Sequence, residues 1–243
     1  MRDDREWQDF QRDGYLHLPG ALDAATVERY RVAHDAMRAK PRPWNQHLLL
    51  TDPDFIALIQ HPAIIDRQAA VFGDQLQLLQ YDLLYQGPQH DGPDRSWHRD
   101  FAFPGDHPLS INTILYLDDI PADGGATYVI PGSHRGLALP PQDDRRTAPL
   151  PGERELRPRA GDVVFINAAI WHSGGSNRSP AQRRTIYIYY GHWWLKPYQS
   201  DQARPWQCLQ HASPATLRLL GHRPPSDLHI YTPTGRLRAP QES

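Results

Sequence analysis

The stretch Leu76-Gln-Leu-Leu-Gln-Tyr-Asp-Leu-Leu-Tyr-Gln86 marks the point where the chain changes from a helical to a strand pattern. From here on, short apolar runs are separated by Gly, Pro and Asp, residues that commonly end strands. Strands are predicted near 76–86, 96–103, 109–117, 126–130, 162–167 and 183–190. This spacing is typical of a sandwich or barrel and not of βαβ units. The predicted fold is therefore mainly β, a jelly roll.

The residues before this stretch carry helix signals. A short helix and a strand-like run are expected within 5–19, and Asp23 is a suitable N-cap for a helix over about 24–40. Prolines just inside the start predict two further helices, near 53–60 and from 62 to about 72. This helical part is expected to pack on one outer face of a sheet.

No internal repeat or long linker divides the chain, so a single domain over 1–243 is predicted. Its parts are a mostly helical cover (1–75), a jelly-roll core (76–196) and a C-terminal extension (197–243) with a weak helix near 214–221. The segment 140–160 is rich in Pro, Arg and Asp and is predicted to be a surface insertion, either a lid or a passive loop.

Charge and composition exclude several classes of function. The formal net charge is −2, which predicts no binding to nucleic acid. Cys208 is the one cysteine, so no internal disulfide can form, and the start of the chain lacks the apolar core of a signal peptide. No stretch approaches the length of an apolar membrane span. A cytoplasmic protein without a membrane partner is expected, and nothing in the sequence specifies an oligomeric state.

A candidate metal site is formed by His98, Asp100 and His172. His98 and Asp100 lie two residues apart in a predicted strand and would share a face. About one such His-x-Asp pair is expected by chance in a chain of this kind, so alone it favours a structural role. His172, at the end of the apolar run that begins at Asp162, could supply a third ligand. Two histidines and one carboxylate form the facial triad of non-haem Fe(II) oxygenases.

Arg183 and Thr185 are candidates for binding a second small molecule. Arg183 follows His172 by eleven residues, and Thr185 shares its face of the predicted strand. Iron held by three protein ligands keeps three positions, enough for a bidentate 2-oxo acid and dioxygen. Arg183 could then bind the far carboxylate of 2-oxoglutarate as a bidentate fork, with the Thr185 hydroxyl beside it.

Several motifs together resemble the phytanoyl-CoA dioxygenase family: His98-Arg-Asp100, Asp123-Gly-Gly-Ala-Thr-Tyr-Val-Ile-Pro-Gly-Ser-His134, Gly161-Asp-Val and His172-Ser-Gly-Gly-Ser-Asn-Arg-Ser-Pro-Ala-Gln-Arg183. The resemblance runs from about Gly14 to Gly191. Its members are Fe(II)- and 2-oxoglutarate-dependent oxygenases on a double-stranded β-helix, and they include ectoine hydroxylase and antibiotic-tailoring enzymes. The resemblance implies His98, Asp100 and His172 as iron ligands and Arg183 as the 2-oxoglutarate anchor.

Further candidates come from strand alternation and from this resemblance. Gln80 and Asp82 alternate on a strand and by rough alignment to ectoine hydroxylase would face the pocket, and Thr113 lies where relatives contact the oxo acid. A buried strand threonine needs no functional explanation, so a structural role for Thr113 stays open. The cofactor-binding candidates are thus Arg183, Thr185, Thr113 and Gln80. The substrate-binding candidates are Asp82, Arg99, Phe101, Tyr187, His192 and Trp194.

Aromatic residues near these motifs suggest a substrate class. They can simply pack the sandwich, yet the adjacent Trp193 and Trp194 cannot both point into one sheet face, so at least one is expected at an opening or a lid. Flat indole faces suit a sugar or a glycosylated or polycyclic natural product. The predicted function is oxidation of an aliphatic C–H bond, by hydroxylation or ring closure, of a specialised and carbohydrate-containing metabolite.

Two alternatives remain from the sequence. One is an acyl-CoA or amino-acid-derivative hydroxylase of the same family. The other is a jelly-roll binding protein without catalysis, against which the complete set of three ligands and a distant arginine argues. Asp100 argues against a halogenase, in which a small residue replaces the carboxylate.

Overall fold

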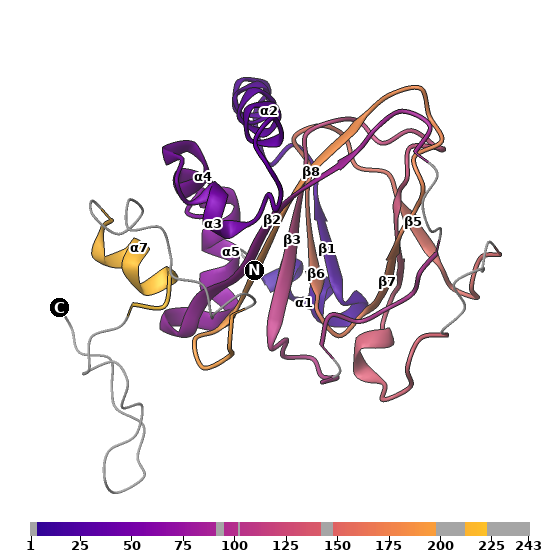
Figure 1. Cartoon of the computed structure of the whole chain (residues 1–243). Coiled ribbons are helices and arrows are strands. Elements are labelled where there is room, and N and C mark those ends of the chain that lie inside the picture. Colours follow the sequence, from indigo (N-terminus) through magenta and orange to yellow (C-terminus); the bar gives the residue numbers. More distant parts are fainter. Residues whose placement is uncertain (1–3, 91–94, 102, 142–147, 198–211, 223–243) are drawn as a thin grey trace, which may run out of the picture.

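Two antiparallel sheets face each other in the computed structural model, which describes residues 4–90, 95–101, 103–141, 148–197 and 212–222 (Figure 1). The five-stranded sheet has the order β1-β6-β3-β8-β2, and the three-stranded sheet has the order β5-β4-β7. The strands are β1 Tyr15–Leu18, β2 Leu76–Gln86, β3 Ser110–Tyr116, β4 Thr127–Ile130, β5 Arg154–Leu156, β6 Val163–Asn167, β7 Trp171–Gly174 and β8 Arg183–His192. The predicted mainly β jelly roll is confirmed.

Helices from the first third of the chain cover the outer face of the five-stranded sheet (Figure 1). They are α1 Asp4–Asp13, α2 Ala24–Arg38, α3 Gln46–Leu49, α4 Pro53–Leu58 and α5 Pro62–Phe72. The Asp23 carboxylate accepts a hydrogen bond from the backbone N–H of Thr26, which confirms the predicted N-cap of α2. Two 3-10 turns, η1 Gly73–Gln75 and η2 Ser133–Arg135, complete the connections that bear on the site.

Alternation along the strands creates two apolar cores. One lies between the helices and the large sheet and contains Leu115, Phe165 and Ile186. The other lies between the two sheets and contains Ile114 and Val129. Because neighbouring residues of a strand point to opposite faces, each central strand of the large sheet contributes side chains to both cores. The space between the sheets is therefore the one place where polar side chains can be enclosed by strands on both sides.

The predicted strand 96–103 is wrong. Within its described residues the backbone is irregular, and His98 alone forms a bridge, with His172. Two strands were not predicted: β7, which contains His172, and β5, which pairs with β4 and lies inside the predicted insertion 140–160. Both are short and contain polar residues, so apolar alternation is too weak to identify them.

The predicted weak helix near the C-terminus is present as α7, Pro214–Leu219, which packs against β2. Its Leu219 and Leu220 are buried in the helix-side core. The rest of the predicted extension, 198–211 and 223–243, lies outside the described residues. Within the described ranges, no helix has the length and apolar character needed to cross a membrane.

Candidate metal centre and 2-oxo acid pocket

His98, Asp100 and His172 converge between the two sheets. Each offers one ligand atom, and these three atoms lie within 4.8 Å of one another. Asp100 Oδ1 is 3.9 Å from His98 Nε2 and 3.7 Å from His172 Nε2. The three residues thus form a triangle on one side of a position that a metal ion could occupy. This is the facial arrangement expected for non-haem Fe(II).

Backbone hydrogen bonds hold this triangle together without a regular strand at His98. His98 and His172 exchange two N–H···O bonds of 3.0 Å, and the N–H of Asp100 donates to the carbonyl of Ala168 at 2.9 Å. The loop 96–100 is therefore attached to β7 and to the turn before it. The expected convergence of His98 and Asp100 is present, although its cause is this attachment and not a shared strand face.

The outer ring nitrogens of both histidines are held by carbonyl groups. His98 Nδ1 lies 2.9 Å from the carbonyl oxygen of Ser96, and His172 Nδ1 lies 3.1 Å from that of Ile170. A carbonyl only accepts, so each Nδ1 carries the proton and each Nε2 keeps its lone pair for a metal. The tautomer of both rings is thereby set for metal binding.

Burial and charge also fit a divalent cation. Burial lowers the pKa of His172, and the neighbouring Asp100 carboxylate opposes this while His98 adds to it. His172 is therefore a neutral imidazole at neutral pH, the form that binds metals. Asp100 Oδ2 is buried and has no hydrogen-bond partner in the described part of the chain. A buried carboxylate oxygen of this kind is costly unless a cation binds it, so the residues present fit iron.

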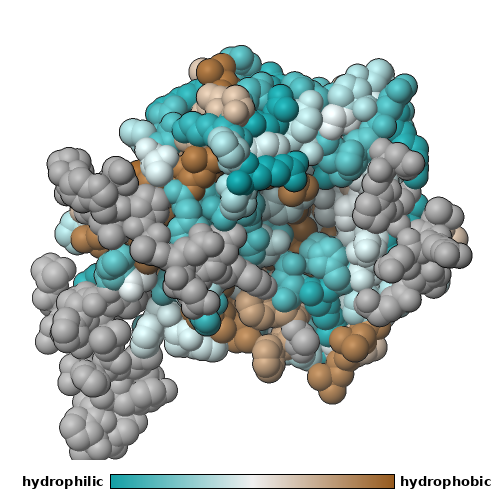
Figure 2. All heavy atoms as spheres, in the orientation of Figure 1, coloured by the Kyte–Doolittle hydropathy of each residue, from teal (hydrophilic) through white to brown (hydrophobic). Residues whose placement is uncertain are grey.

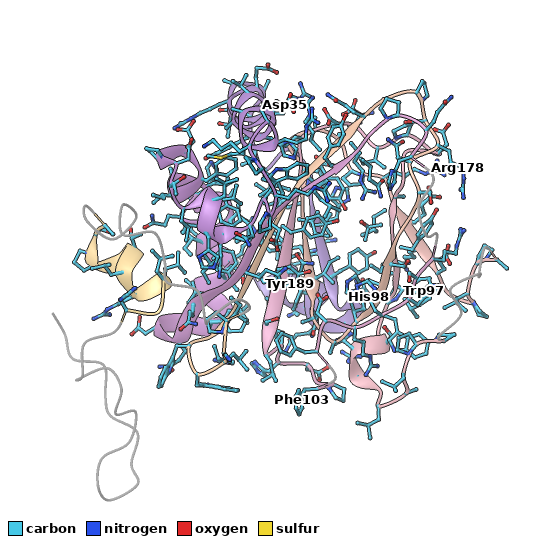
Figure 3. The ribbon with its side chains drawn as sticks, viewed as in Figure 1. Asp35, Trp97, His98, Phe103, Arg178 and Tyr189 are labelled. Carbon is cyan, nitrogen blue, oxygen red and sulfur yellow. The ribbon has the colours of Figure 1, made fainter. Side chains whose placement is uncertain are left out.

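A cavity of about 780 Å³ opens between the sheets beside the triad, and His98, His172 and Arg183 all line it. In Figure 3, His98 and Tyr189 lie on opposite sides of this space. The surrounding outer surface in this view is mostly hydrophilic, as Figure 2 shows. The cavity is large enough for a 2-oxo acid together with a second small molecule.

Arg183 is enclosed at one end of this cavity. Its side chain is 3% exposed, Nη1 donates to the carbonyl of Gly125, and Nε has no partner among the described residues. Thr185 points to the same face of β8, and its buried hydroxyl also has no partner there. A guanidinium with an unused N–H and a nearby free hydroxyl form an anchor suited to a carboxylate. Their part in binding 2-oxoglutarate stays a prediction.

Thr113 does not face the cavity, contrary to expectation. Its hydroxyl accepts a hydrogen bond of 2.8 Å from Gln68 Nε2 of α5, on the helix side of the sheet. The residues of β3 that line the cavity are its neighbours Asn112 and Ile114. The placement of Thr113 was wrong by one residue of strand register, which moves a side chain to the opposite face.

His192 and Trp194 also lie away from the cavity. The His192 ring stacks on Trp194, with centroids 5.1 Å apart and an interplanar angle of 10°, and it meets the edge of Phe72 at the end of α5. Even-numbered residues of β8 face the helices, whereas Arg183, Tyr187 and Tyr189 face the cavity. Trp194 is 53% exposed. The expectation that these two residues contact substrate in the cavity is therefore wrong.

Arg99 and Phe101, the residues next to two metal ligands, are outside the cavity lining as well. Arg99 Nη2 donates to the carbonyls of Ser133 and Gly136, at 2.8 Å each, and burial lowers the pKa of its guanidinium. The N–H of Phe101 bonds to the carbonyl of Ala168. Arg99 thus attaches the ligand loop to the turn at η2, a structural role in place of the predicted contact with substrate.

Gln80, Asp82 and Tyr187 do line the cavity, as expected from strand alternation. Sequence analysis missed other lining residues. Tyr189 and Asn112 could have been found by extending the alternation of β8 and β3. The segment Arg42–Trp44, between α2 and α3, also lines the cavity, and no local pattern in it pointed there.

A jelly roll whose cavity combines a facial triad with a buried arginine defines a class, the 2-oxo-acid-dependent non-haem iron oxygenases. The chain belongs to the phytanoyl-CoA dioxygenase (PhyH) family, whose model matches residues 10–185. Its cofactors are iron and 2-oxoglutarate, with His98, Asp100 and His172 as the facial triad.

Curated relatives share part of the sequence. L-proline trans-4-hydroxylase of Streptomyces griseoviridis is 26% identical, covering 74% of this chain and 82% of the relative. Dioxygenase andF of Emericella variicolor and dioxygenase cdmA of Talaromyces verruculosus are each 30% identical over 52% and 54% of this chain. The matches cover 41% and 46% of these two fungal proteins, so the chain spans less than half of their length.

Solved structures share the fold. The α-ketoglutarate-dependent epimerase SnoN from nogalamycin biosynthesis has a TM-score of 0.64 and 25% identity, covering 78% of this chain and 82% of that one. HygX from Streptomyces hygroscopicus, with nickel, 2-oxoglutarate and hygromycin B bound, has a TM-score of 0.66 and 18% identity. The match covers 80% of this chain and 89% of HygX. At that identity HygX supports the fold alone.

Proposed function

We propose that this protein is an Fe(II)/2-oxoglutarate-dependent dioxygenase that oxidises an aliphatic C–H bond of a specialised metabolite, by hydroxylation or oxidative ring closure. The observation that carries the proposal is that His98, His172 and the buried Arg183 line one cavity, with Asp100 Oδ1 3.9 and 3.7 Å from the Nε2 atoms of the two histidines. A binding protein without catalysis has no need for both groups in one enclosed space.

The metal ligands and the 2-oxoglutarate anchor have different roles and lie at different parts of the cavity. His98, Asp100 and His172 would hold iron beside the cavity, which His98 and His172 line. Arg183, with Thr185 beside it, binds and orients the far carboxylate of 2-oxoglutarate. When bound there, iron supplies the oxidation of a C–H bond, which for hydroxylation converts substrate, 2-oxoglutarate and dioxygen into hydroxylated substrate, succinate and carbon dioxide.

Relatives and structural neighbours support a natural-product substrate. SnoN, at 25% identity, is an enzyme of nogalamycin biosynthesis. A carbohydrate-containing metabolite agrees with the aromatic and polar walls of the cavity, where Tyr187, Tyr189 and Trp44 combine with Gln80 and Asn112.

The alternative acyl-CoA substrate has less support. A CoA phosphate site requires free cations. In the described part of the segment 140–160, Arg157 pairs with Glu155 at 2.9 Å, and Glu153 of that segment pairs with Arg95 at 3.1 Å. These two guanidiniums are already partnered by carboxylates, which makes them unsuited to bind phosphates.

The proposed function is tested by measuring succinate formation with Fe(II), 2-oxoglutarate and dioxygen, in the presence of glycosylated natural products or acyl-CoAs. Stimulation by the glycosylated compounds is expected. Stimulation by acyl-CoAs alone would overturn the substrate class, and absence of any 2-oxoglutarate turnover would overturn the reaction.

A further inference from the structure

The cavity has a second end, remote from Arg183. On β8, Tyr187 is four positions beyond Arg183, a distance of roughly 13 Å along an extended strand. Strand pairing aligns Tyr187 with Asp82 and Ile114, and Tyr189 with Gln80 and Asn112. These two rows lie on the cavity side of the large sheet. Because of this distance, a 2-oxoglutarate molecule anchored at Arg183 leaves the Tyr187 and Tyr189 rows available to another ligand.

Asp82 brings a carboxylate into this end of the cavity. It accepts a hydrogen bond from Gln80 Nε2, and within the described ranges no lysine, arginine or histidine forms an ion pair with it. Burial raises its pKa, and the Gln80 hydrogen bond only partly opposes this. Arg42, at the rim of the cavity, instead places its guanidinium over the ring of Trp44, 4.3 Å from the centroid. A largely enclosed carboxylate without a cation is unfavourable unless a ligand supplies one.

Asn112 is an independent sign of a ligand at the same end. Its side chain is 1% exposed and lines the cavity, yet its Oδ1 has no hydrogen-bond partner among the described residues. A buried acceptor left unpaired costs about 1–3 kcal/mol. Since the Asp82 carboxylate lacks a paired cation and Asn112 Oδ1 lacks a donor among the described residues, the ligand that complements them is positively charged and rich in donors.

We infer that the end of the cavity formed by Asp82, Asn112, Tyr187 and Tyr189 binds an ammonium group of the substrate, so that the substrate is an amine-bearing metabolite. An ammonium group carries three donors and one positive charge. Asp82 accepts a charge-assisted hydrogen bond from it, and the tyrosine rings offer their negative faces to the cation. Asn112, on the other side of β8 and in the neighbouring row, accepts from a second donor of the same substrate. This inference rests on the proposed function and refines its substrate class.

The amine at Asp82 would also orient the substrate. With one end held at the Asp82 row and 2-oxoglutarate held at Arg183, the middle of the substrate is left between them, on the side of the sheet that faces the triad. Asp82 then determines which carbon approaches the metal, and it takes no part in the chemical step.

The test compares binding of amines with binding of their N-acetylated forms, which lose the charge and gain an acetyl group. A penalty from the added bulk would persist in Asp82→Asn, whereas a preference for the charge would not. Hygromycin B, D-glucosamine and L-proline, each paired with its N-acetylated derivative, are titrated by calorimetry into protein loaded with Ni(II) and 2-oxoglutarate, so that no turnover is required. For at least one pair, the amine is expected to bind wild type about 10-fold or more tightly than the derivative, as a charge-assisted hydrogen bond implies. The preference is expected to fall to within about 2-fold in Asp82→Asn.

Two controls distinguish failure of this inference from failure of the proposed function. Asp66→Asn changes an exposed carboxylate of α5 and is expected to keep the preference for the amine. Affinity of the Asp82→Asn variant for 2-oxoglutarate is expected to match wild type, because Arg183 is untouched. No preference in any pair, or a preference that survives Asp82→Asn, would overturn the inference and leave the proposed reaction standing. Failure of wild type to bind 2-oxoglutarate would instead overturn both.

Discussion

His98 and His172 are joined through their backbones by two hydrogen bonds of 3.0 Å, each residue donating to the other. Their imidazole centroids lie 4.2 Å apart, and Asp100 is within reach of both rings. One ligand comes from an irregular loop and the other from β7, so this pairing is what sets the distance between the two ligand atoms. The metal centre is consequently built by contact between segments 74 residues apart.

Asp100→Ala is expected to weaken Fe(II) binding by at least about 100-fold and to abolish substrate oxidation, because the carboxylate is the anionic member of the triad. The fold is expected to persist, because the Asp100 side chain forms no hydrogen bond with the described residues and the backbone N–H of Asp100 keeps its bond to Ala168. Anaerobic Fe(II) titration and circular dichroism check the two parts. Near-normal turnover under limiting iron would show that Asp100 is not a ligand.

Arg183→Ala is expected to raise the apparent KM for 2-oxoglutarate by on the order of 10- to 100-fold, because a charge-assisted carboxylate pair is lost. The KM for substrate is expected to change much less. Steady-state kinetics with each reactant varied in turn give both values. Equal increases in the two constants would contradict an anchor specific for the oxo acid.

Arg184→Ala provides a contrast on the opposite face of β8, where the Arg184 side chain is largely buried. Arg184 donates to Asp118 and Asp35 at 2.8 Å each. Its loss is expected to lower the free energy of unfolding by about 1–3 kcal/mol while leaving 2-oxoglutarate affinity unchanged. Denaturant unfolding and 2-oxoglutarate titration distinguish these effects, and a large loss of oxo acid affinity would show that the faces are assigned wrongly.

Gly125→Ala is expected to impair 2-oxoglutarate binding. Gly125 has φ +76°, and an added Cβ would lie 2.9 Å from Arg183 Nη1 and 2.7 Å from the carbonyl oxygen of Gly175. Gly20→Ala is the matched control, since Gly20 has φ +60° and nothing within 4 Å of an added Cβ. Both variants are expected to lose about 1–2 kcal/mol of stability from backbone strain, but only Gly125→Ala is expected to raise the KM for 2-oxoglutarate. Similar kinetics in the two variants would refute this.

Asp162→Asn is expected to destabilise the fold most at neutral pH. Burial tends to raise the pKa of Asp162, but N–H donors of Arg159 and Gly20 at 2.9 and 2.8 Å, together with His17, lower it overall. Because the folded-state pKa is lowered, the ionised carboxylate stabilises the folded protein at pH values above its ordinary pKa of about 4. This stabilisation is lost as the pH falls through the folded-state pKa.

The free energy of unfolding is therefore expected to fall by about 1–3 kcal/mol in Asp162→Asn at pH 7, with a smaller difference from wild type below about pH 4. Urea unfolding at both pH values measures this, with Asp66→Asn as the exposed control. A difference that grows as the pH falls would contradict the sign of the shift.

Much of the molecule follows from local sequence signals. The Asp23 cap, the prolines that open α4 and α5, and the apolar runs of β2, β3, β6 and β8 are each specified by neighbouring residues. The His-x-Asp pair, the later histidine and Arg183 identify the family because they occur together and in order. These features depend on residue type and spacing, which the sequence contains directly.

The sequence by itself determined which side chains of a strand share a face, but only the tertiary structure decided which face is enclosed between the sheets. Thr113 and His192 were assigned to the cavity and lie on the helix side, whereas Asn112 and Tyr189, each close by in sequence, line the cavity. The strand register relative to the second sheet distinguishes these choices, because a shift of one residue exchanges the two faces. The ligand loop at His98 likewise has no regular conformation of its own, and its geometry comes from hydrogen bonds to a distant strand.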